Sequence, residues 1–112
     1  MTDKIVVLTT CETPEEADRI ASALVESRLA ACVNVVPGVR SVYRWKGAVE
    51  RAQEVLLLVK TSRTLLEAVQ AEIERVHTYE LPEAVALPIV DGSERYLEWI
   101  SSNLAQEDAD ER

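Results

Sequence analysis

Hydrophobic and polar positions alternate in the first arm of the stretch from Cys32 to Lys60, in the middle of the chain. The side chains of this arm fall into two alternating sets. One set ends in aromatic residues and consists of Val39, Ser41, Tyr43 and Trp45. The other set is largely basic and consists of Arg40, Val42, Arg44 and Lys46. This is the period of a β-strand. Gly47 supplies the positive φ that a tight hairpin turn requires. The pattern therefore predicts one long β-hairpin with its turn at Lys46 and Gly47.

The predicted hairpin is longer than the globule that carries it. At about 3.3 Å per residue, the arm from Cys32 to Trp45 runs roughly 45 Å, less what the bend at Pro37 and Gly38 takes. A globule of this chain length has a diameter of roughly 35 Å. The tip must therefore protrude, and a protruding ribbon with open edges and aromatic side chains needs cover from another chain. We expect a homo-oligomer joined through this hairpin.

The stretches on either side of the hairpin predict two amphipathic helices. The first is capped by Thr13, and Glu16 completes a capping box. Apolar residues then recur at helical spacing: Ala17, Ile20, Ala21, Leu24 and Val25. The second helix begins with another capping box, from Ser62 to Glu67, and its apolar stripe ends near His77. Each stripe predicts a helix that lies flat on a sheet.

Two shorter stretches predict the remaining strands. Residues 4–10 contain a continuous apolar run, which is typical of a strand buried on both faces. Residues 84–90 form the last strand, and Pro88 places it at a sheet edge because proline cannot donate to a ladder. A terminal helix that carries Trp99 follows.

The element order is β-α-β-β-α-β with a C-terminal helix, which predicts an α+β, ferredoxin-like βαββαβ sandwich with a long protruding hairpin. Right-handed crossovers place the first and third strands in the centre of an antiparallel sheet. Two helices cover one face, and the terminal helix or a neighbouring subunit covers the other. We expect a single domain over residues 1–104 and an acidic, disordered tail over residues 105–112.

The net charge of −8 over 112 residues favours solubility and argues against nucleic acid or an anionic membrane as a partner. The sequence has no apolar run near the roughly 20 residues that span a bilayer. It also begins without a basic and then apolar signal, so we expect a cytoplasmic protein. Two cysteines are too few for a disulfide scaffold and are expected to be reduced.

Five motifs carry a family resemblance: Leu29-Ala30-Ala31-Cys32-Val33-Asn34, Ser41-x-Tyr43-x-Trp45-x-Gly47, Lys60-Thr61, His77-x-Tyr79-x-x-Pro82-Glu83, and Tyr96-Leu97-x-Trp99. From Ile5 to about Leu104 the chain resembles the CutA divalent-cation tolerance family. The resemblance implies a trimer of ferredoxin-like subunits whose long hairpins zip together. It also implies an association with copper and other divalent metals, and a kinship of shape with the PII signalling proteins.

A copper site is implied by the same resemblance, formed by a histidine before the motif tyrosine and a cysteine at the end of the first strand. His77, the only histidine of the chain, matches the first position, whereas Thr9 occupies the second and Cys11 follows two residues later. We therefore expect His77 and Cys11 as metal ligands. Because the family's cysteine is replaced, copper or another divalent metal is expected to bind without high affinity.

These candidates also have purely structural interpretations. His77 at a helix C-terminus is favourable as a cation, so an electrostatic cap competes with the ligand role. Cys11 precedes a helix whose dipole lowers the pKa of a nearby thiol, or it is a loop residue without a role. Cys32 fits a small buried hydrophobe.

The motif residues also predict a cleft between subunits, lined by Tyr43, Trp45, Lys60, Tyr79, Glu83 and Trp99. Tyr43 and Trp45 equally suit packing between subunits. The alternative function is a small-molecule sensor or signalling trimer that resembles PII, although the chain lacks a phosphate-loop motif. We expect no enzyme, because Cys11 and His77 are the only pair of nucleophile and base and nothing in their spacing shows that they meet.

Overall fold

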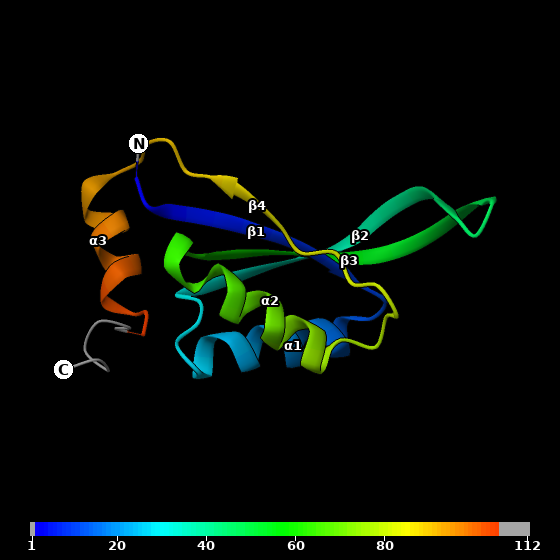
Figure 1. Ribbon diagram of the computed structural model, residues 1–112, viewed down its shortest axis with the longest axis horizontal. Helices are drawn as coiled ribbons and strands as arrows, with labels where there is room; N and C mark the ends of the chain where they lie inside the picture. The colour runs from blue at the N-terminus through cyan, green and yellow to red at the C-terminus, as the bar shows by residue number, and fades with distance from the viewer. Residues whose placement is uncertain (1, 106–112) are drawn as a thin grey trace.

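The computed structural model describes residues 2–105 of the 112. One four-stranded antiparallel sheet, in the order β2-β3-β1-β4, carries two helices on one face and a third helix across one end (Figure 1). The elements are β1 (Lys4–Cys11), α1 (Pro14–Glu26), β2 (Cys32–Trp45), β3 (Ala48–Ser62), the 3₁₀ turn η1 (Arg63–Leu65), α2 (Leu66–Val76), β4 (Val85–Pro88) and α3 (Glu94–Ser102). This confirms the predicted α+β, ferredoxin-like fold. Apart from Ala105, the predicted acidic tail lies outside the described residues.

The strand order agrees with the prediction from connectivity. β1 and β3 lie in the centre, paired from Lys4 opposite Ser62 to Cys11 opposite Val55. β4 is the edge strand and pairs only with Ile5 to Leu8 of β1. It is shorter than the predicted strand over residues 84–90 and ends at Pro88, although the Ile89 amide still donates to the Lys4 carbonyl oxygen at 3.0 Å.

The core lies between the sheet and the two covering helices. Ile20 and Leu24 of α1 and Val69 and Ile73 of α2 are fully buried against this face of the sheet. The predicted stripe of α1 is wrong at its end, because Val25 is 40% exposed. Val25 lies on the flank of the stripe, one turn after the partly buried Ala21, whereas Leu24 beside it is fully buried.

The two predicted capping boxes have different outcomes. Thr13 caps α1 as expected, since its Oγ1 accepts a hydrogen bond from the Glu16 amide at 3.1 Å. The Glu16 carboxylate, however, accepts from the Glu12 amide instead of closing the box on Thr13. The second box is wrong: η1 intervenes, α2 begins at Leu66, and the Ser62 hydroxyl contacts the Thr64 hydroxyl.

The hairpin of β2 and β3 extends beyond the globule, as predicted (Figure 1). The molecule measures 49 × 27 × 24 Å, and the hairpin provides the excess length. Lys46 and Gly47 both have positive φ, 51° and 84°, which is the geometry of a tight primed turn. A register shift between Val36 and Val39 marks the bend at Gly38, where φ is 77°.

The other face of the sheet carries no helix (Figure 1). Alternation along the paired strands places seven aliphatic side chains on it: Val6, Leu8, Val36, Leu56, Leu58, Val85 and Leu87. We call these residues the open face. Val36 is 38%, Leu87 50% and Val85 51% exposed. None of the described helices is long and apolar enough to cross a membrane.

Candidate functional site

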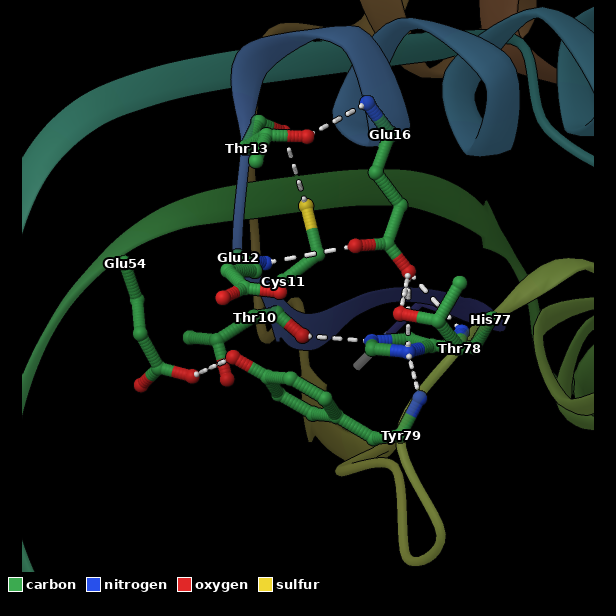
Figure 2. A network of polar contacts seen from close by, with 9 residues as sticks. All are labelled: Thr10, Cys11, Glu12, Thr13, Glu16, Glu54, His77, Thr78 and Tyr79. Carbon is green, nitrogen blue, oxygen red and sulfur yellow. Dashed lines mark hydrogen bonds and ion pairs between the residues drawn. The ribbon is translucent and has the colours of Figure 1, made fainter.

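A cluster of polar side chains lies where β1 ends, beside the start of α1 and the end of α2 (Figure 2). We call it the polar cluster. Its members are Thr10, Cys11, Glu12, Thr13, Glu16, Glu54, His77, Thr78 and Tyr79. The sheet brings Cys11 and His77, the two predicted metal ligands, into this one cluster.

His77 uses both ring nitrogens within the chain. Nε2 lies 2.7 Å from the Thr10 carbonyl oxygen and therefore donates to it, whereas Nδ1 accepts from the Tyr79 amide at 3.0 Å. These two partners define the neutral ring protonated at Nε2. The side chain is fully buried, and neither ring nitrogen bonds to a carbonyl of α2, which gives no support to the predicted electrostatic cap at the end of that helix. A metal at Nδ1 has to displace the Tyr79 amide.

Glu16 is buried and accepts three hydrogen bonds in this cluster. Its Oε2 receives the Thr78 amide at 2.9 Å and the Thr78 hydroxyl at 2.8 Å, and its Oε1 receives the Glu12 amide at 3.4 Å. Oε2 also lies 3.3 Å from Nδ1 of His77. Burial alone raises the pKa of Glu16, but the hydrogen bonds from Thr78 and Glu12 outweigh it and hold the pKa below its usual value.

Cys11 is fully buried at the end of β1, and its Sγ donates to the Thr13 carbonyl oxygen at 3.5 Å (Figure 2). Burial, with Glu16 adding to it, raises the pKa of this thiol to about 11. The expectation that the helix dipole favours a thiolate is therefore wrong, because loss of water outweighs the dipole. The expectation that Cys11 is a loop residue is also wrong.

The described residues hold no ready-made metal site. Within residues 2–105, no three side chains of His, Cys, Asp or Glu are grouped so that they could hold a metal ion. Thr9, at the family's cysteine position, is fully buried, and its hydroxyl has no hydrogen-bond partner. Metal binding at His77 and Cys11 therefore needs ligands from water or from another chain.

The six residues of the predicted cleft lie in separate places within one chain. Tyr43 and Trp45 are close to the hairpin tip, and Glu83 is exposed in the connector before β4. The Tyr79 hydroxyl donates to Glu54 at 2.6 Å, at the base of the hairpin. Within residues 2–105 of one chain, the contacts of these residues do not bring all six together.

Lys60 and Trp99 both lie beside Tyr96, at the other end of the sheet. The Lys60 ammonium lies 5.9 Å from the centre of the Tyr96 ring and 2.6 Å from Oδ1 of Asn34. The rings of Tyr96 and Trp99 stack at 5.5 Å. A shallow hollow beside Asp3, at the start of α3, contains none of the six predicted residues.

The sequence analysis did not single out four residues of the polar cluster: Thr10, Glu12, Glu54 and Thr78. Glu54 and Thr78 are polar residues without a motif of their own, and their partners lie 25 and 62 residues away. Only the pattern of alternation in β3 offered a signal for Glu54, which follows a run of exposed hairpin residues and precedes the buried strand.

A profile described as CutA1 divalent ion tolerance protein matches residues 5–103. The chain is 51% identical over 98 residues to the divalent-cation tolerance protein CutA of Thermus thermophilus, covering 88% of this chain and 95% of that protein. It is 44% identical over 99 residues to a chloroplastic CutA of Arabidopsis thaliana, also 88% of this chain. It spans about half, 54%, of that longer relative.

Solved structures agree in fold. The Cut A1 protein of Thermus thermophilus superposes with a TM-score of 0.89 at 49% identity, covering 91% of this chain and 99% of that one. CutA1 of Oryza sativa superposes with a TM-score of 0.90 at 42% identity, covering 92% and 94%. The fold, including the long hairpin, is thus shared with these proteins.

Proposed function

This chain belongs to the CutA1 divalent ion tolerance protein family, and from that premise we propose that it serves copper tolerance as a homotrimer that binds the metal directly. The observation that carries the metal assignment is the placement of His77, the only imidazole of the chain, 3.3 Å from the Glu16 carboxylate. We propose the cytoplasm as its location, since both cysteines are free thiols. We assign it no catalytic activity.

Assembly is supported by the open face. Seven aliphatic side chains on one sheet surface, with Leu87 and Val85 half exposed, form the kind of contiguous apolar patch that soluble monomers avoid. No described helix covers it. A second copy of the same chain supplies an equally apolar surface.

The hairpin supports the same assembly. Alternation places Tyr43 and Trp45 on the side of the hairpin that continues the open face, since Glu50 opposite Tyr43 has the parity of Leu56 and Leu58 in β3. Tyr43 is 44% and Trp45 37% exposed in the single chain. A neighbouring subunit that packs on the open face also covers these rings, so the hairpins hold the trimer together.

Direct copper binding at His77 requires the loss of one hydrogen bond within the chain. Copper at Nδ1 replaces the hydrogen bond from the Tyr79 amide, and the nearby Glu16 carboxylate favours the positive charge. The remaining ligands come from water or a neighbouring subunit. We therefore expect modest affinity, which falls as the pH drops because a protonated ring cannot coordinate. Cys11, protonated and buried, is at most a second ligand for the reduced metal.

Copper titration by calorimetry tests this assignment. We compare the wild type with His77→Gln, which keeps a donor for the Thr10 carbonyl, and with Cys11→Ser. Sedimentation confirms the assembly of each variant. We expect His77→Gln to lose binding while it stays trimeric. Copper binding that is unchanged in trimeric His77→Gln places the site elsewhere, and no binding to the wild type refutes direct binding.

A substitution on the open face, with a control on α1, tests whether the chain forms a trimer. Leu58→Glu introduces a charge among the aliphatic side chains, whereas Val25→Glu changes an exposed position of α1. We expect sedimentation of the wild type and of Val25→Glu at three times 12.5 kDa, and of Leu58→Glu at the monomer mass. A wild type that sediments as a monomer refutes the proposal.

Small-molecule sensing is the second candidate function. It draws support from Lys60 beside the stacked rings of Tyr96 and Trp99, a combination that suits an anionic ligand with a planar ring. A panel of nucleotides in the same calorimetric experiment distinguishes it from copper binding. Binding of a nucleotide that Lys60→Ala abolishes favours the sensor.

A further inference from the structure

The chain segment that directly follows α2 is held from two sides (Figure 2). On one side, the Thr78 amide and hydroxyl both donate to the Glu16 carboxylate of α1. On the other side, the Tyr79 hydroxyl donates to Glu54 of β3 at 2.6 Å. The backbone amide of Tyr79 lies between these two attachments and donates to Nδ1 of His77 at 3.0 Å. Contacts with two other elements therefore set the position of this amide.

Two contacts fix the side chain of Tyr79. Its ring packs against the imidazole of His77, with 4.5 Å between the ring centres and 40° between the ring planes. Its hydroxyl bonds to the carboxylate of Glu54, which is only 9% exposed. Burial and then the nearby Glu54 raise the pKa of the Tyr79 hydroxyl above its usual value, so the hydroxyl keeps the proton that it donates. A short hydrogen bond inside the protein thus anchors this side chain.

Glu54 lies where the hairpin leaves the sheet. The pairing of β3 with β1 ends at Val55, the residue that follows Glu54. Glu54 itself is paired with Val39 of β2, directly after the register shift. The anchor of Tyr79 is therefore part of the hairpin base, and a shift of that base moves the anchor.

The Tyr79 amide occupies the nitrogen that a metal needs. Nε2 of His77 carries the proton and donates to the Thr10 carbonyl, so Nδ1 holds the one lone pair of the ring that can accept. This lone pair accepts an amide hydrogen or binds a metal, but not both. The fraction of molecules in which Nδ1 is free therefore sets the apparent metal affinity.

We propose that Tyr79 and Glu54 form a latch that holds the Tyr79 amide on Nδ1 of His77 and so limits the access of a metal to this nitrogen. Tyr79 is a positioning residue, because its hydroxyl acts on His77 through the backbone. Loss of the latch leaves Nδ1 free in a larger fraction of molecules, which raises the metal affinity. The effect on metal binding rests on the copper function proposed above, whereas the hold on Nδ1 is a property of the chain alone.

The direction of the effect distinguishes a latch from a contact that only stabilises the site. Removal of a purely stabilising contact weakens metal binding, whereas removal of the latch strengthens it. Tyr79→Phe tests this directly, because phenylalanine keeps the ring that packs on the imidazole and removes only the hydroxyl.

Glu54 offers a matched pair of variants. Glu54→Gln keeps a carbonyl oxygen that accepts from the Tyr79 hydroxyl, whereas Glu54→Ala has no acceptor. Both remove the same negative charge, so the difference between them reports the hydrogen bond. Ser62→Ala is the structural control, since it removes a buried hydroxyl whose 3.2 Å contact with Thr64 lies at the end of β3. Sedimentation of each variant checks that the assembly is unchanged.

Nitrogen-15 NMR of the imidazole gives the first readout and requires no metal. His77 is the only histidine of the chain, so Nδ1 gives a single resonance. At mildly alkaline pH, we expect this resonance to move toward the frequency of a nitrogen without a hydrogen bond in Tyr79→Phe and in Glu54→Ala. It should stay at the wild-type frequency in Glu54→Gln and in Ser62→Ala.

Copper titration by calorimetry gives the second readout. We expect copper to bind about threefold more tightly to Tyr79→Phe than to the wild type, because the competing amide is held less firmly. The same ratio is expected between Glu54→Ala and Glu54→Gln. Ser62→Ala should bind copper as the wild type does.

The two readouts separate the latch from the copper function. An unchanged Nδ1 resonance in Tyr79→Phe overturns the latch, whatever the titration shows. A freed Nδ1 with unchanged or weaker copper binding overturns its role in metal access, and equal results for Glu54→Ala and Glu54→Gln contradict it by showing an effect of charge alone. If the resonance moves while neither the wild type nor any variant binds copper, the copper function is refuted and the hold of the latch on Nδ1 is confirmed.

Discussion

The buried Glu16 carboxylate connects residues from different parts of the chain. Its carboxylate joins the start of α1 to Glu12 on one side and to Thr78, 62 residues later, on the other. It also lies beside His77, whose ring is anchored to the Thr10 carbonyl. The candidate metal residue is therefore held in place by the Thr10 carbonyl and the Tyr79 amide, with the Glu16 carboxylate beside it. His77 and Glu16 can both be tested by substitution.

The first prediction concerns Glu16→Gln. The amide cannot accept the same three hydrogen bonds as a buried carboxylate, so we expect the free energy of unfolding at pH 7 to fall by about 2 kcal/mol. Urea denaturation at fixed protein concentration measures this. Glu15→Gln, in the same helical turn but exposed, should change stability by less than about 1 kcal/mol. Equal effects of the two substitutions would contradict the role of the cluster.

The pH dependence of this effect has a defined sign. The pKa of Glu16 is lowered in the folded protein, so its contribution is present above the unfolded pKa of about 4.3 and is lost as the pH falls through the folded pKa. The stability difference between wild type and Glu16→Gln should therefore shrink below about pH 4. A difference that is constant from pH 7 to pH 3 would be evidence against the lowered pKa.

Two buried threonines provide the second prediction. The Thr9 hydroxyl has no partner, whereas the Thr61 hydroxyl donates to the Leu29 carbonyl at 2.7 Å. Thr9→Val should raise the free energy of unfolding by about 1 kcal/mol, and Thr61→Val should lower it by a similar amount. Thermal denaturation of both variants compares them directly, and a lower Tm for Thr9→Val would indicate a partner for this hydroxyl.

At the scale of elements, the hairpin depends on its turn, and the start of α1 depends on its Thr13 cap. The turn needs two consecutive residues with positive φ, and Gly47 provides the more extreme value of 84°. The start of α2 has no side-chain cap and is preceded by a 3₁₀ turn instead. A local motif thus specifies the turn, whereas the start of α2 follows from packing.

The third prediction tests this turn. Gly47→Ala places a side chain in a left-handed conformation and should destabilise the protein by about 1–2 kcal/mol. Gly92→Ala is the matched control, since Gly92 lacks a positive φ and an added methyl group meets Leu97 at 3.6 Å, an ordinary contact. Denaturant midpoints of the two variants give the comparison. Equal midpoints would mean that the turn relaxes without cost.

At the scale of the whole molecule, the hairpin turns a compact sandwich into an elongated subunit with two different outer surfaces. One side carries Tyr43 and Trp45 and continues the open face, and the other side carries Arg40, Arg44 and Arg51. A molecule of 49 × 27 × 24 Å exposes both along the same ribbon.

The fourth prediction separates the two sides of the hairpin. Trp45→Ala should weaken the trimer, because truncation of an aromatic side chain buried at a contact costs about 3–5 kcal/mol. Arg44→Ser, on the next residue but the opposite side, should leave the trimer intact. Sedimentation across a dilution series measures both. Dissociation caused by Arg44→Ser alone would exchange the roles assigned to the two sides.

The fold was predictable because its signals are local. The alternation of the hairpin, the Lys46-Gly47 turn, the Thr13 cap and Pro88 at the edge each depend on residues a few positions apart. For the candidate site, the sequence predicted which types of residue take part but not how they are arranged. His77 was identified as the single imidazole, but its partners Thr10 and Glu16 come from other elements and left no local pattern.

The sequence by itself determined the element order, the sheet topology, the protruding hairpin and the family resemblance, since periodicity and turn chemistry act within one element. Only the tertiary structure decided that Cys11 is a buried thiol, that both nitrogens of His77 are engaged and that Glu16 is a buried anion. The physical reason is that protonation and ligand capacity depend on burial and on hydrogen-bond partners. Those partners lie far apart in the chain and meet only when the sheet and helices pack.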